Sequence, residues 1–141
     1  MEIKEAINHR EAIIALLSSE KLPTSDLPAS LDNFLAMIKD NELLGVVGLE
    51  KYGHYGLLRS LAVSRDFRSQ GIANKLVGQL EKLADAKGLK AIFLLTETAP
   101  DYFSRKGYQT IARAEIPVEV QQSSEFSHVC PQSAIAMKKE L

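Results

Sequence analysis

Two arginines and a glycine lie close together near the middle of this 141-residue chain, between a predicted strand and a predicted helix. The apolar run at residues 57–63 indicates the strand, and the helical periodicity of residues 72–87 indicates the helix. The first amides of a helix lack intrahelical acceptors and lie at the positive end of its dipole, so they attract phosphate. Gly71 has no Cβ that would keep an anion from this backbone, and Arg65, Arg68 and Lys75 supply positive charge nearby. The pattern predicts a phosphate-binding loop, although it has fewer glycines than the common nucleotide-binding loops.

The segment Arg68-Ser-Gln-Gly71-Ile-Ala73 resembles the Arg/Gln-x-x-Gly-x-Gly/Ala signature of the GNAT N-acetyltransferase superfamily. That resemblance implies acetyl-CoA as co-substrate, with loop amides holding its pyrophosphate and the end of the preceding strand pairing with its pantetheine arm. It also implies direct attack of an amine on the thioester in a ternary complex. The residues assigned to the cofactor in this way are Leu61, Ala62, Val63, Arg68, Ser69, Gln70, Gly71, Ile72, Ala73 and Phe103.

A second family element, Asn-x-x-Ala-x-x-x-Tyr, is present only in part. Thr96 replaces the asparagine, and Phe103 replaces the tyrosine that in the family protonates the departing thiolate. Tyr102 is adjacent, but a helix step of about 100° is expected to turn it away from the site. The proton donor is therefore left open. The positions that match are Ala99, Gly107 and Tyr108.

The last third of the chain is also similar to GNAT proteins encoded with arsenic-resistance genes. The similarity covers residues 102–108, 113–117 and 125–137. It implies membership of that subgroup but gives no acceptor. For the whole sequence we expect an N-acetyltransferase that acts on a primary amine of a small molecule, such as an amino acid or an analogue.

Arg59 interrupts the apolar strand, and a charged group in that position must be paired or lie at an opening. Two interpretations stay open: a contact with a carboxylate or oxyanion of the substrate, or an internal salt bridge. Glu50, on the preceding predicted strand, is a candidate partner for Arg59 and also a candidate base for the amine.

Four further residues are candidates for catalysis or substrate binding. His54 lies in a turn and has a side-chain type suited to a base, although an exposed turn histidine is the alternative. Glu97 follows a buried strand, at the end where ligands commonly bind. Ser133 is a candidate proton donor or pocket residue. Cys130 is expected to line the substrate site or to be buried, rather than to act as a nucleophile.

The order of the remaining elements predicts an α/β (α+β) domain and is similar to the element order of the GNAT family. That resemblance implies the GNAT fold, with a central, mostly antiparallel mixed sheet flanked by helices. Asn8 and Glu11 predict a capping box for the first helix, whose apolar stripe runs through residues 12–17. We expect one domain over residues 1–141. The other predicted strands are residues 3–6, 34–39, 43–51, 91–95, 110–116 and 134–138, and the last predicted helix is residues 100–106.

Composition excludes several classes of function. The net charge is −1, so no overall field draws the chain to nucleic acid or to an anionic membrane. One cysteine and three scattered histidines predict neither a disulfide framework nor a metal site. The longest apolar stretch is too short to span a bilayer, and the acidic N-terminal residues are unlike a signal peptide, so we expect a cytoplasmic protein. A homodimer is compatible with the predicted edge strands.

Two other functions on the same fold compete with acetylation of a small molecule. The first is acetylation of a protein, for which the sequence offers no acidic run to form a basic-substrate groove. The second is a sensor or scaffold that binds CoA without catalysis, and Phe103 in place of the family's tyrosine supports it.

Overall fold

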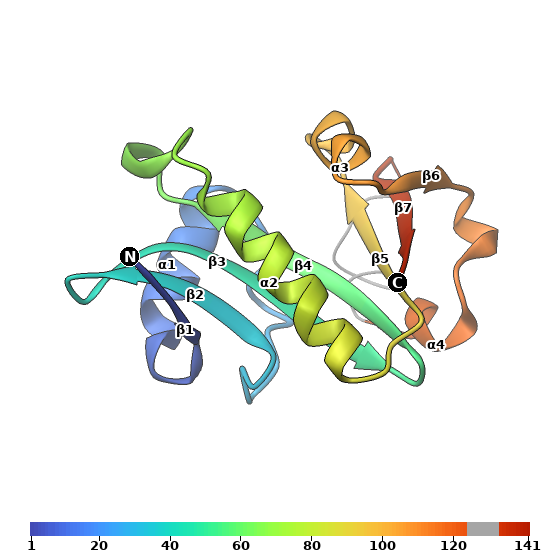
Figure 1. Cartoon of the computed structure of the whole chain (residues 1–141), viewed down its shortest axis with the longest axis horizontal. Helices are drawn as coiled ribbons and strands as arrows, with labels where there is room; N and C mark the ends of the chain where they lie inside the picture. Colours follow the sequence, from blue (N-terminus) through green and yellow to red (C-terminus); the bar gives the residue numbers. More distant parts are fainter. Residues whose placement is uncertain (124–132) are drawn as a thin grey trace.

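The computed structural model describes residues 1–123 and 133–141, and these residues form a seven-stranded sheet in the order β1-β2-β3-β4-β5-β7-β6 (Figure 1). Within this part of the chain, no helix is long and apolar enough to cross a membrane. The strands are β1 Glu2–Glu5, β2 Phe34–Lys39, β3 Glu42–Tyr52, β4 Tyr55–Val63, β5 Ala91–Thr96, β6 Gln109–Ile111 and β7 Ile135–Glu140. The helices are α1 Arg10–Ser19, α2 Ile72–Ala86, α3 Pro100–Arg105 and α4 Val118–Gln121, and the short 3₁₀ turns are η1 Ile7–His9, η2 Arg65–Phe67 and η3 Arg113–Glu115.

The sheet is antiparallel except between β4 and β5, which run parallel. The parallel ladder pairs Tyr55–Leu57 with residues 91–93 and then stops, so the two strands separate toward their C-terminal ends (Figure 1). The predicted fold class, a mostly antiparallel sheet flanked by helices, is confirmed.

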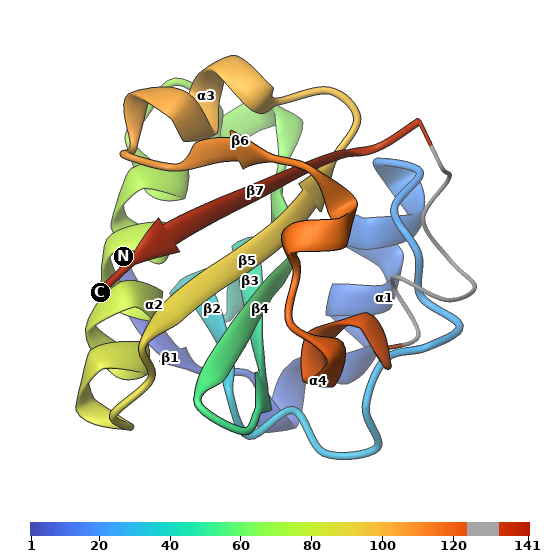
Figure 2. The ribbon, with the colours of Figure 1, turned by 90° about the vertical axis from the view of Figure 1, so that its right-hand side faces the viewer.

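Helices cover both faces of the sheet, with α1 on one side and α2 on the other (Figure 2). The apolar stripe of α2 packs on β2, β3 and β4 and includes the fully buried Leu76 and Leu80. On the opposite face, Ile13 and Leu17 of α1 pack against a separate cluster that contains Phe34. Alternate residues of β2 and β3 enter these two cores, as expected for a sheet buried on both sides.

Two predicted local features are wrong. The strand expected over residues 110–116 ends at Ile111, because the chain turns into η3, where the Glu115 carboxylate accepts the Ala112 N–H at 3.2 Å. The capping box expected at Asn8 is not formed, since α1 begins at Arg10 with no side-chain cap. Arg10 instead ties α1 to the following loop by donating to the Pro28 carbonyl oxygen at 2.6 Å.

The structure shows Arg59 in an internal ion pair, which is one of the two interpretations left open by the sequence. Its side chain is 1% exposed, and it donates two parallel hydrogen bonds of 2.8 Å to the Asp26 carboxylate. Glu50 is the weaker partner, with 3.4 Å between its Oε1 and Arg59 Nη1. The bidentate pair fixes the loop after α1 on β4, so Arg59 has a structural role that does not depend on a substrate.

We expect Asp26→Ala to destabilise the fold by about 3–5 kcal/mol, because it leaves the Arg59 guanidinium buried without its main counter-ion. Urea unfolding followed by circular dichroism measures the loss. The control is the double variant Asp26→Leu with Arg59→Met, which removes both charges and should be more stable than the single variant. A single-variant loss of less than about 1 kcal/mol, the range of an exposed pair, would contradict this role.

A second, partly buried network joins α2 to the C-terminal strands. The Tyr108 hydroxyl donates to Glu81 at 3.1 Å, and Lys139 Nζ lies 3.1 Å from both oxygens of the same carboxylate. Burial, and next the charge of Glu81, raise the pKa of Tyr108 above the ordinary tyrosine value of 10.0.

Because the raised pKa favours the neutral hydroxyl in the folded protein, the unfolded chain loses this proton first, and the free energy of unfolding falls as the pH rises past 10.0. We expect Tyr108→Phe to cost about 1 kcal/mol at pH 7 and to reduce that alkaline loss. Unfolding curves between pH 7 and 11 measure both effects. An unchanged alkaline slope in the variant would mean that another group causes the loss.

Candidate active site

A cavity of about 600 Å³ opens where β4 separates from β5, between the N-terminus of α2 and α3. Its wall contains every residue predicted to bind the cofactor except Gln70 and Phe103. The other members of the wall were not predicted, because they lie in the segment after α1, in η2, in the first turn of α2 and in the segment that leads from β5 into α3. The full lining is Glu20, Leu22, Leu61, Ala62, Val63, Phe67, Arg68, Ser69, Gly71, Ile72, Ala73, Asn74, Thr98, Ala99 and Tyr102.

A bulge in β4 shapes the floor of the cavity. Val46 pairs with Ala62 and Gly48 pairs with Arg59, so β4 has one more residue than β3 across this interval. Ser60 takes a left-handed conformation there, with φ of +59°. In the described part of the chain, the β4–β5 ladder also ends at Leu57, so residues 58–63 have no strand partner on that side. The backbone of Leu61–Val63 can therefore hydrogen-bond to a ligand in the cavity.

Gly71 starts α2 in a left-handed conformation, with φ of +78°. A Cβ built on Gly71 meets no atom within 4 Å, so the space beside this backbone is open. The first intrahelical bond comes from the Lys75 N–H to the Gly71 carbonyl oxygen, and the amides of residues 72–74 lack such a partner. The first turn contains no acidic residue, so its positive potential is not cancelled locally. These features suit an anion such as a diphosphate.

Arg68 holds the loop and also reaches an acid on the cavity wall. Its Nε donates to the Val63 carbonyl oxygen at 3.3 Å, and its Nη2 is paired with Glu20, which follows the last residue of α1. Arg65 Nε lies 3.8 Å from the same carboxylate, but the Arg65 side chain is exposed and does not line the cavity. Glu20 therefore offsets part of the positive charge at the loop.

The expectation that Tyr102 turns away from the site is wrong. Tyr102 lines the cavity, and its hydroxyl donates to Asn74 Oδ1 at 2.9 Å. Phe103 instead packs in the core against Tyr108 and is 5% exposed, so its predicted place at the cofactor is also wrong. Partial burial, followed by the charge of Glu81, raises the pKa of Tyr102, so the hydroxyl stays protonated at neutral pH. The Thr96 hydroxyl oxygen accepts the Ala99 N–H at 3.1 Å and so closes the turn that leads into α3.

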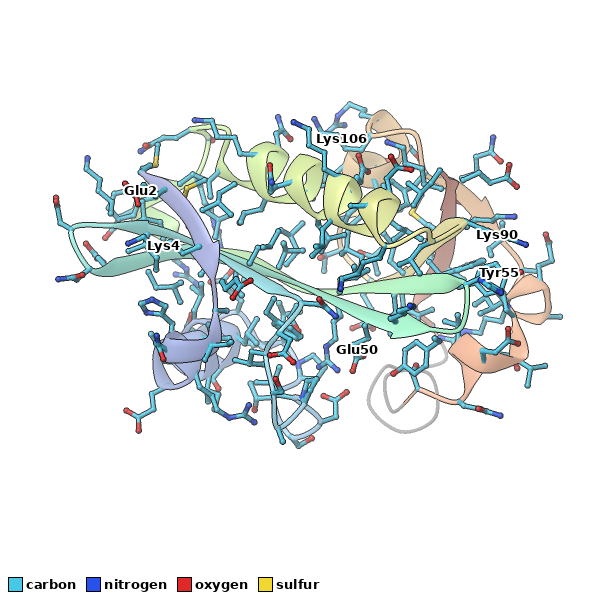
Figure 3. All side chains as sticks on the ribbon, turned by 60° about the horizontal axis from the view of Figure 1, so that its bottom comes forward. Glu2, Lys4, Glu50, Tyr55, Lys90 and Lys106 are labelled. Carbon is cyan, nitrogen blue, oxygen red and sulfur yellow. The ribbon has the colours of Figure 1, made fainter. Side chains whose placement is uncertain are left out.

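The predicted catalytic residues lie elsewhere. Glu50 points to the face of the sheet opposite α2, where it lines a separate cavity of about 250 Å³ (Figure 3). Glu97 and Ser133 come together, with 3.3 Å between Ser133 Oγ and Glu97 Oε1, but neither lines the main cavity. Cys130 lies outside the described residues.

His54 lies in the turn between β3 and β4, where its carbonyl oxygen accepts the Lys90 N–H. Tyr55 and Lys90, which flank it, lie at one end of the sheet (Figure 3). The strand rise places this turn about 20 Å from Leu61, and His54 does not line the main cavity, so its role at the substrate site stays a prediction. Among the described residues, no group of three or more His, Cys, Asp or Glu side chains is placed to hold a metal ion.

Known proteins resemble this chain over different lengths. An uncharacterized N-acetyltransferase of Chlorobaculum tepidum is 28% identical over 102 residues, which is 67% of this chain and 65% of that protein. An amino-acid acetyltransferase of Ectopseudomonas mendocina is 34% identical over 62 residues, or 44% of this chain and 14% of that protein. The chain thus matches less than two thirds of the length of either relative.

The fold is shared with a solved enzyme. The N-acetylglutamate synthase of Neisseria gonorrhoeae, crystallised with coenzyme A and N-acetyl-glutamate, superimposes with a TM-score of 0.82 and 19% identity, covering 99% of this chain and 35% of that one. The acetyltransferase (GNAT) family model matches residues 9–110, which contain β4, the phosphate-binding loop and α2. With most of its length matched by that model, this chain belongs to the GNAT acetyltransferase family.

Proposed function

We propose that this chain transfers the acetyl group of acetyl-CoA to the primary amine of a small molecule. The observation that carries the proposal is one cavity that combines an anion seat at the start of α2 with the backbone of Leu61–Val63, which has no partner strand on the β5 side in the described part of the chain. A diphosphate joined to a thioester by a long, mostly apolar arm needs both features at once. The volume of about 600 Å³ and the partly apolar wall formed by Leu22, Phe67 and Ile72 suit such an arm.

The residues of this chain support direct attack by the amine. Backbone N–H groups at Leu61–Val63 polarise the thioester carbonyl as the nitrogen adds to its carbon. As the C–N bond forms, the C–S bond breaks, and sulfur leaves with the electron pair. The Tyr102 hydroxyl, neutral at pH 7 and on the cavity wall, gives its proton to that sulfur. The proton released by the amine nitrogen returns to Tyr102 through water.

An amino acid or an analogue is the acceptor that the relatives favour, since both the Ectopseudomonas and the Neisseria proteins are named for acetylating amino acids. Both resemblances are distant, so this acceptor is part of the proposal. The predicted arsenic-resistance subgroup, the cytoplasmic location, the homodimer and the extent of the domain remain predictions.

We expect Gly71→Glu to weaken binding of acetyl-CoA at least about tenfold, or about 1.4 kcal/mol, because the new carboxylate fills the open space at the anion seat. The matched control is Gly88→Glu, which has the same left-handed conformation (φ of +75°) and open surroundings, but lies at the other end of α2. Both variants should lose similar stability, and only the first should lose affinity in calorimetric titration. Equal affinities would contradict the anion seat.

Turnover tests the catalytic part of the proposal. We expect wild type to release CoA thiol with amino acids, and Tyr102→Phe to lower kcat about tenfold or more with little change in KM for acetyl-CoA. The control is Phe103→Leu, which changes the neighbouring core residue and should mainly lower stability. Release with protein substrates alone would favour a protein acetyltransferase. Binding of acetyl-CoA with no release across a broad amine panel would favour the sensor.

A further inference from the structure

A second cavity, of about 390 Å³, lies on the other side of α2, against β1 and β2. Asn74 lines both this cavity and the main one, so the two lie on neighbouring sides of the same residue. The Asn74 Oδ1 accepts the Tyr102 hydroxyl, so its Nδ2, a donor of two hydrogen bonds, remains for a ligand at the junction. The lining is Met1, Ile3, Met37, Asn74, Lys75, Gly78, Gln79 and Lys82.

The charge of this second cavity is positive. Its lining includes Lys75 and Lys82 and no acidic residue. Among the described residues neither lysine takes part in an ion pair, whereas Arg65 and Arg68 in the main loop share Glu20. Lys75 also lies in the first turns of α2, where the dipole disfavours a cation and no acid compensates. An anion bound beside Lys75 would relieve that repulsion.

We infer that Lys75, assisted by Lys82, binds the 3′-phosphate of coenzyme A and makes the site selective for CoA over its 3′-dephospho form. This inference rests on the proposed function, because it requires the diphosphate of the same molecule at Gly71. In coenzyme A the 3′-phosphate and the diphosphate are attached to one ribose, so the second anion must lie close to the first.

The helix geometry meets this requirement. Lys75 is four residues after Gly71, an axial distance of about 6 Å, and lysine side chains on a helix point back toward its N-terminus. Lys82 lies about 10 Å further along the axis, so it contributes mainly at long range. Asn74 stands between the two anions, where its Nδ2 can donate to the ribose or to either phosphate. The apolar side chains of Ile3 and Met37 form part of the wall of the second cavity.

The test compares coenzyme A with 3′-dephospho-coenzyme A in calorimetric titrations of the whole chain. Wild type should bind coenzyme A about tenfold more tightly, as expected for one charge-assisted contact at a partly exposed site. Lys75→Gln should lose most of this ratio by weakening coenzyme A alone, and Lys82→Gln should lose a smaller part. The matched control is Lys87→Gln, which removes the same charge at the C-terminal end of α2 and should keep the ratio.

Each other outcome overturns the inference in a recognisable way. If wild type binds both ligands equally, or if Lys75→Gln weakens both by the same factor, the 3′-phosphate site is wrong while acetyl transfer stands. If Lys87→Gln lowers the ratio as much as Lys75→Gln does, general electrostatics rather than a site is responsible. If neither ligand binds, the inference and the proposed function fail together.

Discussion

The early end of the parallel ladder between β4 and β5 is the constraint on which the site depends. A strand in the middle of a sheet normally satisfies its backbone from both sides. Here the pairing of β4 with β5 stops at Leu57. The bulge at Ser60 then shifts the register of β4 against β3 by one residue. In the described structure this end of β4 pairs with β3 alone and borders a cavity, so a ligand with its own amides and carbonyl is the partner that the proposed function places there. The helix that follows β4 then starts at the mouth of the same opening.

Charge around that opening is balanced by residues far apart in sequence. Glu20, at the end of α1, reaches Arg68 and approaches Arg65, so the loop is not an uncompensated cationic site. The first turn of α2 itself contains no acidic residue, and the described lining of the second cavity beside Lys75 contains none either. In the proposed function, a diphosphate is attracted mainly by fixed backbone dipoles, which cost no side-chain ordering when it binds. In this arrangement Arg68 mainly stabilises the loop, by donating a hydrogen bond to the Val63 carbonyl oxygen.

Local sequence signals were sufficient for the fold and for most of the cavity wall that we propose binds the cofactor. The apolar run of β4, the periodicity of α2 and the glycine between them are adjacent in sequence, so one segment carries the whole anion seat. Local signals did not predict the position of a side chain that depends on a contact with a residue distant in sequence. Asp26 is thirty-three residues from Arg59, and no local pattern marks it as the counter-ion. The orientation of α3 failed for a similar reason, because burial of Phe103 against Tyr108 turns Tyr102 to the cavity.

The contrast between local signals and distant contacts also explains why the sequence predicts the family better than it predicts the acceptor amine. The proposed cofactor contacts use backbone, and the glycine and the helix start that shape this backbone can be seen in a single sequence. Acceptor recognition depends on side chains brought together from separate elements, and here the most suggestive of them, Arg59, is already neutralised by Asp26 and Glu50. An acceptor carboxylate would have to displace a buried bidentate partner to reach that guanidinium, at a cost of several kcal/mol. Specificity for the amine must therefore arise from groups other than the one charged residue that interrupts the strand.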